Sequence, residues 1–399
     1  MTHAAQWHAQ GLALLEKGEP QEASSFLYRV WQTEPDNAEY MITFGRLCAE
    51  MGDYEKACGF YLSALRLEPE SSLAHYSLAN VRKQFGQLPE AIEHYTRAIA
   101  IKPAYAEAFN NRGGAHHTAG NLDSARADYL RAIDIKPDLV QAYLNLGRLL
   151  DSGGDNTAAA GVYQRALDAG LDQGLFEHLL ISVSGGTSEK APLGYLRAIF
   201  DDYAPAFDLH LMRQLEYDLP SRIGAIVHAH AAQLGKKLVV IDLGCGTGLC
   251  GVELQQCVEH LAGVDASPLM LEQADRRAIY HDLVEGDAES YLTGLPAASA
   301  DVVIAADVFI YIGNLAGIFA QAQRVLNSGG LYMFSIELLA EDVPYKLQRT
   351  GRYQHAASYI ASLVADAGLV MQASQPVNLR LELGLPVAGT LFTLTKPIH

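Results

Sequence analysis

Four prolines stand 34 residues apart in the first half of the chain, at positions 35, 69, 103 and 137. Glycines at 18, 52, 86, 120 and 154 keep the same period, and so do alanines at 23, 57, 91, 125 and 159. Several columns in one register indicate a stack of similar units, in which each unit buries its apolar face against its neighbours. Residues 1–173 are therefore predicted to form a solenoid.

Each unit has the pattern of two amphipathic helices joined by a turn that contains glycine. A small residue on the first helix, such as Gly45, lets the two helices approach closely, and a large one on the second, such as Tyr61, fills the space between them. The proline then ends the second helix. These features resemble the tetratricopeptide repeat, and the units run over 4–37, 38–71, 72–105, 106–139 and 140–173.

The resemblance implies a concave groove of the kind that receives peptides or proteins in this repeat family. Polar residues of the first helices are the candidates to line it, namely Asn110, Asn111, Arg112, Asn145 and Arg148. Because the repeat pattern carries no ligand chemistry of its own, an architectural role or self-association, as in a homodimer, stays equally open.

The period stops after residue 173, and the stretch SVSGGTSEKAP at 182–192 is rich in glycine, serine and proline. We expect a linker over 174–194 and a second domain over 195–399, which begins with a helical cap at 195–235. Tyr203 and Phe207 of this cap are candidates to contact a cofactor or substrate, and packing between helices is the alternative for both.

A glycine-rich loop follows the first strand-like run of the second domain, in LVVIDLGCGTGLCGVEL at 238–254. One register, which begins at Gly246, fits the dinucleotide pattern GxGxxG. Another, Asp242-x-Gly244-x-Gly246-x-Gly248, fits the loop of S-adenosylmethionine enzymes. We favour the second register, because it starts where the strand ends and lets the amino-acid part of the cofactor pass close to the backbone.

Acidic residues at the ends of the next two strand-like runs bear on the same choice. Asp265 ends HLAGVD, where a carboxylate can accept both ribose hydroxyls in either cofactor class. Asp287 follows the next run, at the position where S-adenosylmethionine enzymes carry an acidic residue that receives the adenine amino group. A fourth run spans 301–313, a fifth reaches Glu337, and residues 377–396 are expected to form two strands joined around 384–389.

These motifs together resemble the class I S-adenosylmethionine-dependent methyltransferases, and the whole chain resembles bacterial predicted TPR-repeat methyltransferases. The resemblance implies an all-α solenoid followed by a Rossmann-like α/β domain, whose mostly parallel seven-stranded sheet ends in an antiparallel hairpin. It also implies S-adenosyl-L-methionine as the cofactor. The cofactor-binding residues that it implies are Asp242, Gly244, Cys245, Gly246, Gly248, Asp265, Ala266, Asp287, Ala288, Asp307, Tyr203 and Phe207.

Methyl transfer from a sulfonium depends mainly on alignment, and a base is needed only when the acceptor keeps its proton. The catalytic candidates are His355, Tyr353 and Tyr311, because they lie at the end of the fourth run or precede the last helical segment. A histidine can act as a base near neutral pH, although a lone histidine is more often structural.

Charge and composition exclude several classes of binding partner. The net charge of −17 argues against binding of nucleic acid, and no apolar run approaches the roughly 20 residues that cross a bilayer, so we expect no membrane partner. The N-terminus lacks the pattern of a signal peptide, which predicts a cytoplasmic location. The five cysteines show no CxxC spacing, and Asp307 with Glu337 offers too few carboxylates, so no metal is expected.

Three functions fit these features. The leading one is a methyltransferase that modifies an oxygen or nitrogen atom of a protein or peptide-linked acceptor recruited by the repeats. The second keeps the enzyme but gives it a small carboxylate or amine acceptor, with the repeats as a lid or oligomerisation module. The third is a non-catalytic scaffold that senses S-adenosylmethionine, and the complete set of glycines and acidic residues counts against it.

Overall fold

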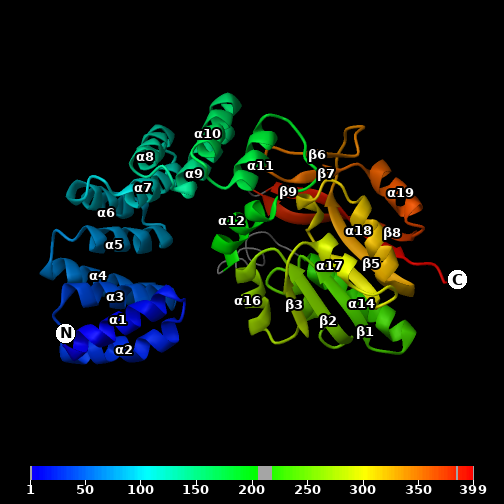
Figure 1. Ribbon diagram of the computed structural model, residues 1–399, viewed down its shortest axis with the longest axis horizontal. Helices are drawn as coiled ribbons and strands as arrows, with labels where there is room; N and C mark the ends of the chain where they lie inside the picture. Colours follow the sequence, from blue (N-terminus) through cyan, green and yellow to red (C-terminus); the bar gives the residue numbers. More distant parts are fainter. Residues whose placement is uncertain (1, 205–217, 383–384, 399) are drawn as a thin grey trace. The chain divides into compact units, whose positions relative to one another are not determined.

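The computed structural model describes residues 2–204, 218–382 and 385–398. The chain divides into two compact units, residues 1–171 and 172–399, and each has its own hydrophobic clusters. Figure 1 shows helices throughout the first unit and a sheet covered by helices in the second. This confirms the predicted fold class.

The first unit consists of helix pairs that follow one another along the chain (Figure 1). The helices are α1 (His3–Glu16), α2 (Pro20–Thr33), α3 (Ala38–Glu50), α4 (Tyr54–Leu67), α5 (Ser72–Gln84), α6 (Leu88–Ile101), α7 (Ala106–Thr118), α8 (Leu122–Ile135), α9 (Val140–Ser152) and α10 (Asn156–Asp168). The helix boundaries keep the 34-residue period, so the repeats account for this unit.

Glycines occur at two kinds of position in the repeats, in the turns and on the first helices. The glycines of the turns have φ between 71° and 81°, a left-handed conformation that side chains with a Cβ adopt only at a cost. The glycines of the first helices lie against the second helices. A Cβ built on Gly45 would stand 2.4 Å from Cε1 of Tyr61, and one on Gly147 would stand 2.3 Å from Cε1 of Tyr163. The close approach of the paired helices therefore agrees with the expectation from the sequence.

The second unit is an α/β domain with helices on both sides of its sheet (Figure 1). Its elements are α11 (Gln173–Val183), α12 (Leu193–Tyr203), α14 (Leu219–Leu234), β1 (Leu238–Leu243), α15 (Leu249–Leu254), β2 (Val258–Asp265), α16 (Pro268–Arg276), β3 (Asp282–Glu285), α17 (Ala288–Gly294), β4 (Ala300–Ala305), the 3₁₀ helix η2 (Phe309–Tyr311), α18 (Ala316–Val325), β5 (Leu326–Glu337), β6 (Tyr345–Leu347), β7 (Tyr353–His355), α19 (Ala357–Asp366), β8 (Val370–Glu382) and β9 (Leu385–Thr395).

The strand order of the described sheet is β3-β2-β1-β4-β5-β9-β8. Strands β1 to β5 pair in parallel, whereas β9 runs antiparallel to both β5 and β8, which is the predicted closing hairpin. β1 lies between β2 and β4, so successive connections leave it on opposite sides. In an open α/β sheet, ligands bind in the crevice outside the carboxyl ends of the strands at such a point.

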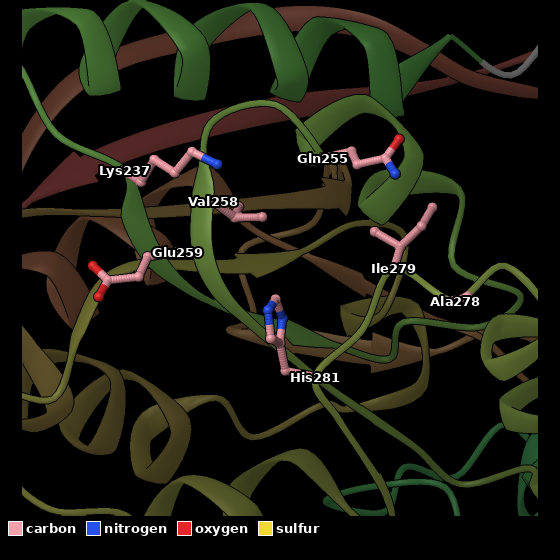
Figure 2. A pocket seen from close by; sticks show the side chains of 7 residues that line it. All are labelled: Lys237, Gln255, Val258, Glu259, Ala278, Ile279 and His281. Carbon is pink, nitrogen blue, oxygen red and sulfur yellow. The ribbon is translucent and has the colours of Figure 1, made fainter.

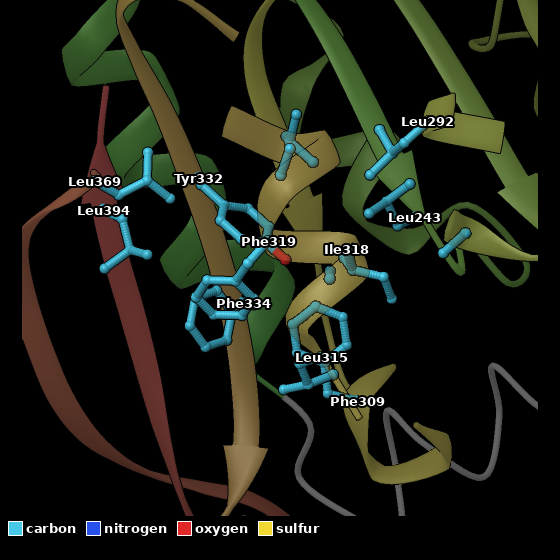
Figure 3. Close-up of a cluster of buried hydrophobic side chains, with 14 of the residues drawn as sticks. Leu243, Leu292, Phe309, Leu315, Ile318, Phe319, Tyr332, Phe334, Leu369 and Leu394 are labelled. Carbon is cyan, nitrogen blue, oxygen red and sulfur yellow. The ribbon is translucent and has the colours of Figure 1, made fainter. Parts of the chain in front are cut away.

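Successive residues of the central strands face opposite layers, as a sheet covered on both sides requires. Val303 of β4 and Phe334 of β5 belong to one cluster with Phe319 of α18, which Figure 3 shows in part. Val302 and Met333 belong to the other cluster, which contains apolar residues of α14. The two layers hold the strands in place and leave their carboxyl ends to the connecting loops.

Three segments differ from what we expected. The segment 174–194 contains most of α11, whose Phe176 is fully buried in the second unit, although its composition predicted a linker. The fourth strand ends at Ala305, because Asp307 turns the chain with φ 57°. Gly389 lies within β9 opposite Glu337 rather than in the hairpin turn, and a Cβ there would stand 2.5 Å from Leu379.

The packing of the repeats makes a prediction about two glycines of one repeat. Gly45→Ala should lower the free energy of unfolding of the repeat unit by about 1–3 kcal/mol, because the new methyl group meets the ring of Tyr61. Gly59→Ala, on the second helix with open space around it, should instead raise it by up to about 1 kcal/mol. Urea denaturation followed by the fluorescence of Trp7 and Trp31 measures both changes, and equal effects would contradict the packing.

Candidate active site

The loop after β1 has a left-handed backbone conformation at three positions, which glycine adopts more readily than any other residue. Gly244, Gly246 and Gly248 have φ values of 61°, 53° and 87°. A Cβ on Gly244 would also stand 2.6 Å from Cγ2 of Val308. The loop lies at the carboxyl end of β1, beside the end of β4, so its backbone borders the crevice of the sheet.

Asp265, at the end of β2, joins this loop to the next one. Its Oδ2 accepts a hydrogen bond of 2.8 Å from the backbone N–H of Gly246, and its Oδ1 accepts one of 2.9 Å from the N–H of Ser267. Burial raises the pKa of Asp265, although these backbone hydrogen bonds act in the opposite direction. The carbonyl of the adjacent Ala266 accepts a hydrogen bond of 3.2 Å from Nε of Arg197.

Asp242 lies beneath the glycine loop, near the end of β1. Its side chain is buried, and its Oδ2 accepts a hydrogen bond of 2.7 Å from the hydroxyl of Tyr280. The other oxygen, Oδ1, is buried without a hydrogen-bond partner in the described structure. Burial raises the pKa of this carboxyl to about 7. Such an oxygen is an acceptor for the donor groups of a ligand, since an unsatisfied buried acceptor is costly.

Tyr280 explains why the loop also fits the dinucleotide pattern. A Cβ on Gly251, the third glycine of GxGxxG, would stand 2.7 Å from Cε2 of Tyr280, and a Cβ on Gly263 of β2 would stand 2.8 Å from its Cε1. Gly251 therefore makes room for a protein side chain. The sequence did not predict a role for Tyr280. The only signal was the pair Gly251 and Gly263, which have no role in cofactor binding.

Asp287 follows β3 and caps α17. Its Oδ1 accepts a hydrogen bond of 3.1 Å from the N–H of Ser290 and lies 3.7 Å from Nζ of Lys190. Burial tends to raise the pKa of Asp287, but these hydrogen bonds and the charge of Lys190 outweigh it and lower the pKa. Ala288 is buried next to it, and Cys245 of the glycine loop is a buried thiol.

Helix α12 contacts the same edge of the sheet. Arg197 forms an ion pair with Glu285 at the end of β3, and Asp201 accepts a hydrogen bond of 2.5 Å from the hydroxyl of Ser267. Phe200 packs edge-on against Tyr311, with ring centroids 5.4 Å apart. Of the cap expected over 195–235, α12 therefore lies at the carboxyl ends of the strands, whereas α14 packs against a face of the sheet. The side chain of Tyr203 and all of Phe207 lie outside the described part.

The loop after β4 is held from two sides. On one side, the carbonyl of Tyr311 accepts a hydrogen bond of 2.8 Å from the N–H of Ala191, and the carbonyl of Glu189 accepts one from the N–H of Gly313. On the other side, the N–H of Asp307 donates a hydrogen bond of 2.9 Å to Oγ of Ser335. A non-glycine residue with φ 57° is strained, and strain of this kind is common at functional sites.

His355 and Tyr353 support this loop from the buried side. Nε2 of His355 lies 2.8 Å from the carbonyl oxygen of Ile312 and 3.1 Å from that of Gly313, so Nε2 carries the hydrogen. Burial lowers the pKa of His355 to about 4, despite these hydrogen bonds. Tyr353 is fully buried, and its hydroxyl lies 2.6 Å from that of Ser188. Both side chains thus fix the loop, whereas a general base needs access to the acceptor.

A separate pocket of about 430 Å³ lies near the amino ends of β1, β2 and β3 (Figure 2). It is lined by Lys237, Gln255, Val258, Glu259, Ala278, Ile279 and His281. These residues precede β1, β2 and β3 or begin them, so the pocket is remote from the loops that follow the strands. Within the described ranges, no three histidine, cysteine or acidic side chains are grouped to hold a metal ion, and no helix is long and apolar enough to span a membrane.

Comparison with known families assigns the two units. Residues 241–334, which contain the glycine loop, Asp265 and Asp287, match the family model of a methyltransferase domain. Residues 14–81, 80–120, 117–151 and 142–175 match models of tetratricopeptide repeats. The chain thus joins a class I methyltransferase domain to tetratricopeptide repeats.

Individual relatives resemble the methyltransferase domain over part of their length. The chain is 29% identical over 121 residues to a malonyl-[acyl-carrier protein] O-methyltransferase of Serratia marcescens, which corresponds to 30% of this chain and 45% of that protein. It is 26% identical over 140 residues to the probable S-adenosylmethionine-dependent methyltransferase CRG1 of Saccharomyces cerevisiae, or 33% of this chain and 47% of that protein. The chain therefore spans less than half of either relative.

Two solved structures each resemble part of the chain. A crystal structure of MamA is 26% identical, with a TM-score of 0.37, over 40% of this chain and 94% of that chain. The structure of the [4+2]-cyclase SpnF is 17% identical, with a TM-score of 0.37, over 45% of this chain and 82% of that chain.

The residues at the carboxyl edge of the methyltransferase domain fit S-adenosylmethionine, the cofactor that the family match and the relatives support. The glycine loop carries no side chains at three positions where the amino-acid part of the cofactor would pass, and the buried Oδ1 of Asp242 has no partner among the described residues. Two carboxylates lie at the ends of adjacent strands: Asp265 is the last residue of β2, and Asp287 follows β3.

The buried imidazole of His355 predicts a dependence of stability on pH. Its pKa falls from an ordinary value of 6.5 to about 4 on folding, so the unfolded chain binds a proton that the folded chain excludes between these values. The stability that His355 contributes should therefore fall by about 2 kcal/mol between pH 7 and pH 5. The raised pKa of Asp242 acts in the opposite direction, so wild type must be compared with a variant at each pH.

Chemical denaturation of wild type and His355→Gln between pH 7 and pH 5 makes this comparison, since Asp242 is common to both proteins. The difference between their free energies of unfolding should shrink as the pH falls. A difference that does not change with pH would show that His355 is not held neutral in the folded protein.

Proposed function

We propose that this protein transfers a methyl group from S-adenosylmethionine to an oxygen or nitrogen atom of an acceptor carried by a protein or peptide, which the repeats recruit. The observation that carries the proposal is the buried pair of carboxylates at the carboxyl edge. Asp265 accepts a hydrogen bond from the backbone of the glycine loop, and one oxygen of Asp242 beneath that loop has no partner in the part of the chain that the structure describes.

The bound cofactor would supply an activated methyl group on a sulfonium, whose departure leaves a neutral thioether. The protein's own residues would then bind, orient and exclude water. Asp242 would accept a hydrogen bond from the cofactor's amino group, Asp265 would accept from its ribose, and Asp287 would lie near its adenine. Tyr311, held by Ala191 and packed against Phe200, would border the acceptor.

The described residues favour an acceptor that is already deprotonated. His355 is buried with a pKa of about 4, and burial raises the pKa of Tyr353 to about 12, so neither is suited to remove a proton near pH 7. A carboxylate needs no base. The relatives named malonyl-[acyl-carrier protein] O-methyltransferase methylate an oxygen of a carrier-bound acceptor, which agrees with a protein-linked carboxylate here.

Polar side chains of the first helices join consecutive repeats, and we propose that an extended peptide binds along these helices. Asn111 donates hydrogen bonds of 3.0 Å to Asn80 and Tyr76 of the preceding repeat, and Asn145 of the following repeat donates one of 3.0 Å to Asn110. These polar residues come from first helices, as expected. Arg112 instead forms a two-pronged ion pair with Asp128, at 2.7 and 2.8 Å, and donates a hydrogen bond of 3.0 Å to Thr96 of the preceding repeat, so its guanidinium group is already engaged.

Methyl transfer from labelled S-adenosylmethionine into cell extract tests the proposal. We expect label in protein, released by mild alkali as a methyl ester would be, and absent with Asp265→Ala because this change removes two hydrogen bonds of the loops. Alkali-stable label would favour a nitrogen acceptor. Absence of transfer in both protein and small-molecule fractions, despite cofactor binding, would favour the non-catalytic scaffold.

A chain that lacks residues 1–171 distinguishes the two enzyme functions. Labelling of a protein acceptor should fall at least about tenfold if the repeats recruit it, whereas cofactor affinity should be retained because the second unit has its own core. Unchanged transfer to a small acceptor would favour the alternative, in which the acceptor is a free carboxylate or amine.

A further inference from the structure

Residues 277–281, which connect α16 to β3, form hydrogen bonds with the glycine loop and with β2. Nε of Arg277 donates a hydrogen bond of 2.6 Å to the carbonyl of Thr247 within the loop. The backbone N–H of His281 donates a hydrogen bond to the carbonyl of Leu261 in β2. In return, the N–H of Leu261 donates one of 3.1 Å to Nδ1 of the His281 ring. Tyr280 stands between these two anchors, so its backbone is fixed against β2.

The ring of Tyr280 fills a space enclosed by three glycines. Cβ atoms built on Gly248, Gly251 and Gly263 would each stand within 2.9 Å of it. Rings have no flexible end that could yield to such contacts, so the three positions and the ring form one packed unit. This packing fixes the hydroxyl of Tyr280 at 2.7 Å from Oδ2 of Asp242.

We propose that Tyr280 is a positioning residue for the cofactor: its hydroxyl holds Oδ2 of Asp242, which leaves Oδ1 to accept the ammonium group of the cofactor's amino-acid part. The inference rests on the proposed cofactor site. It assigns a role to a residue that does not itself contact the cofactor, because Tyr280 acts through the buried carboxylate.

The groups around Asp242 leave this role to Tyr280. The neighbours that bear on its charge are Tyr280, Asp265 and the buried thiols of Cys245 and Cys250. Burial raises the pKa of Asp242 most, and the negative charge of Asp265 raises it further. The hydrogen bond from Tyr280 lowers the pKa, and no other described group does so. Its loss should therefore favour the protonated acid.

Calorimetric titration with S-adenosylhomocysteine, from about pH 6 to pH 9, tests the inference on the full chain. Tyr280→Phe keeps an aromatic ring in the space between Gly248, Gly251 and Gly263 and removes only the hydroxyl. We expect about fivefold weaker binding than wild type at pH 7, and a ratio of dissociation constants that approaches one at pH 9, as the midpoint moves up by about one pH unit. Because the ratio is taken at each pH, titration of the ligand's own amino group cancels.

Two further variants separate this role from a structural one. Tyr332→Phe is the matched control, because Tyr332 is fully buried in the same unit and its hydroxyl has no partner among the residues described. The affinity of this variant should equal that of wild type. In an Asp242→Asn background, Tyr280→Phe should cause no further change, since its effect passes through the carboxylate.

Equal affinities of wild type and Tyr280→Phe at every pH would overturn the inference, and so would a loss that is constant with pH and persists with Asp242→Asn. If wild type itself fails to bind S-adenosylhomocysteine, the cofactor site fails as well, and the two failures are thereby distinguished. Should Tyr280→Phe not fold, 3-fluorotyrosine at position 280, a stronger donor of similar shape, should move the midpoint to lower pH, and an unmoved midpoint would contradict the role.

Discussion

The packing of one tyrosine ring against three glycines organises the carboxyl edge of the methyltransferase domain. Tyr280 occupies the space that side chains at Gly248, Gly251 and Gly263 would take, so the glycine loop and β2 approach one another closely. That approach lets Asp265 receive backbone hydrogen bonds from both loops. The same ring places a hydroxyl on Asp242, which leaves one carboxylate oxygen for a ligand.

The loop after β4 depends on a second set of contacts, between the start of the unit and its far end. Residues 189–191 hydrogen-bond to the outer side of the loop, and His355 hydrogen-bonds to its inner side. Tyr311 is fixed between them, against Phe200 of α12. Helices α11 and α12 are therefore part of the methyltransferase domain, and the strain at Asp307 is maintained by contacts on both sides.

The sequence predicted the parts that repeat or follow regular periods. The 34-residue columns predicted the helix pairs, and the order of strands and acidic residues predicted the sheet with its closing hairpin. It did not predict contacts between distant segments. The glycine and serine content of 182–192 suggested a linker, but hydrogen bonds to the loop after β4 hold part of this segment. His355 stands in a sequence that suits a catalytic base, and only its burial against Ile312 and Gly313 reveals a supporting position.

The central claim is that the carboxyl edge is built for S-adenosylmethionine rather than for a dinucleotide. Calorimetry of the purified chain with S-adenosylmethionine and, separately, with NAD tests it most directly. We expect saturable binding of S-adenosylmethionine at one site per chain, much weaker binding by Asp265→Ala, and no binding of NAD. Binding of NAD alone, or of neither compound, would contradict the assignment of the glycine loop.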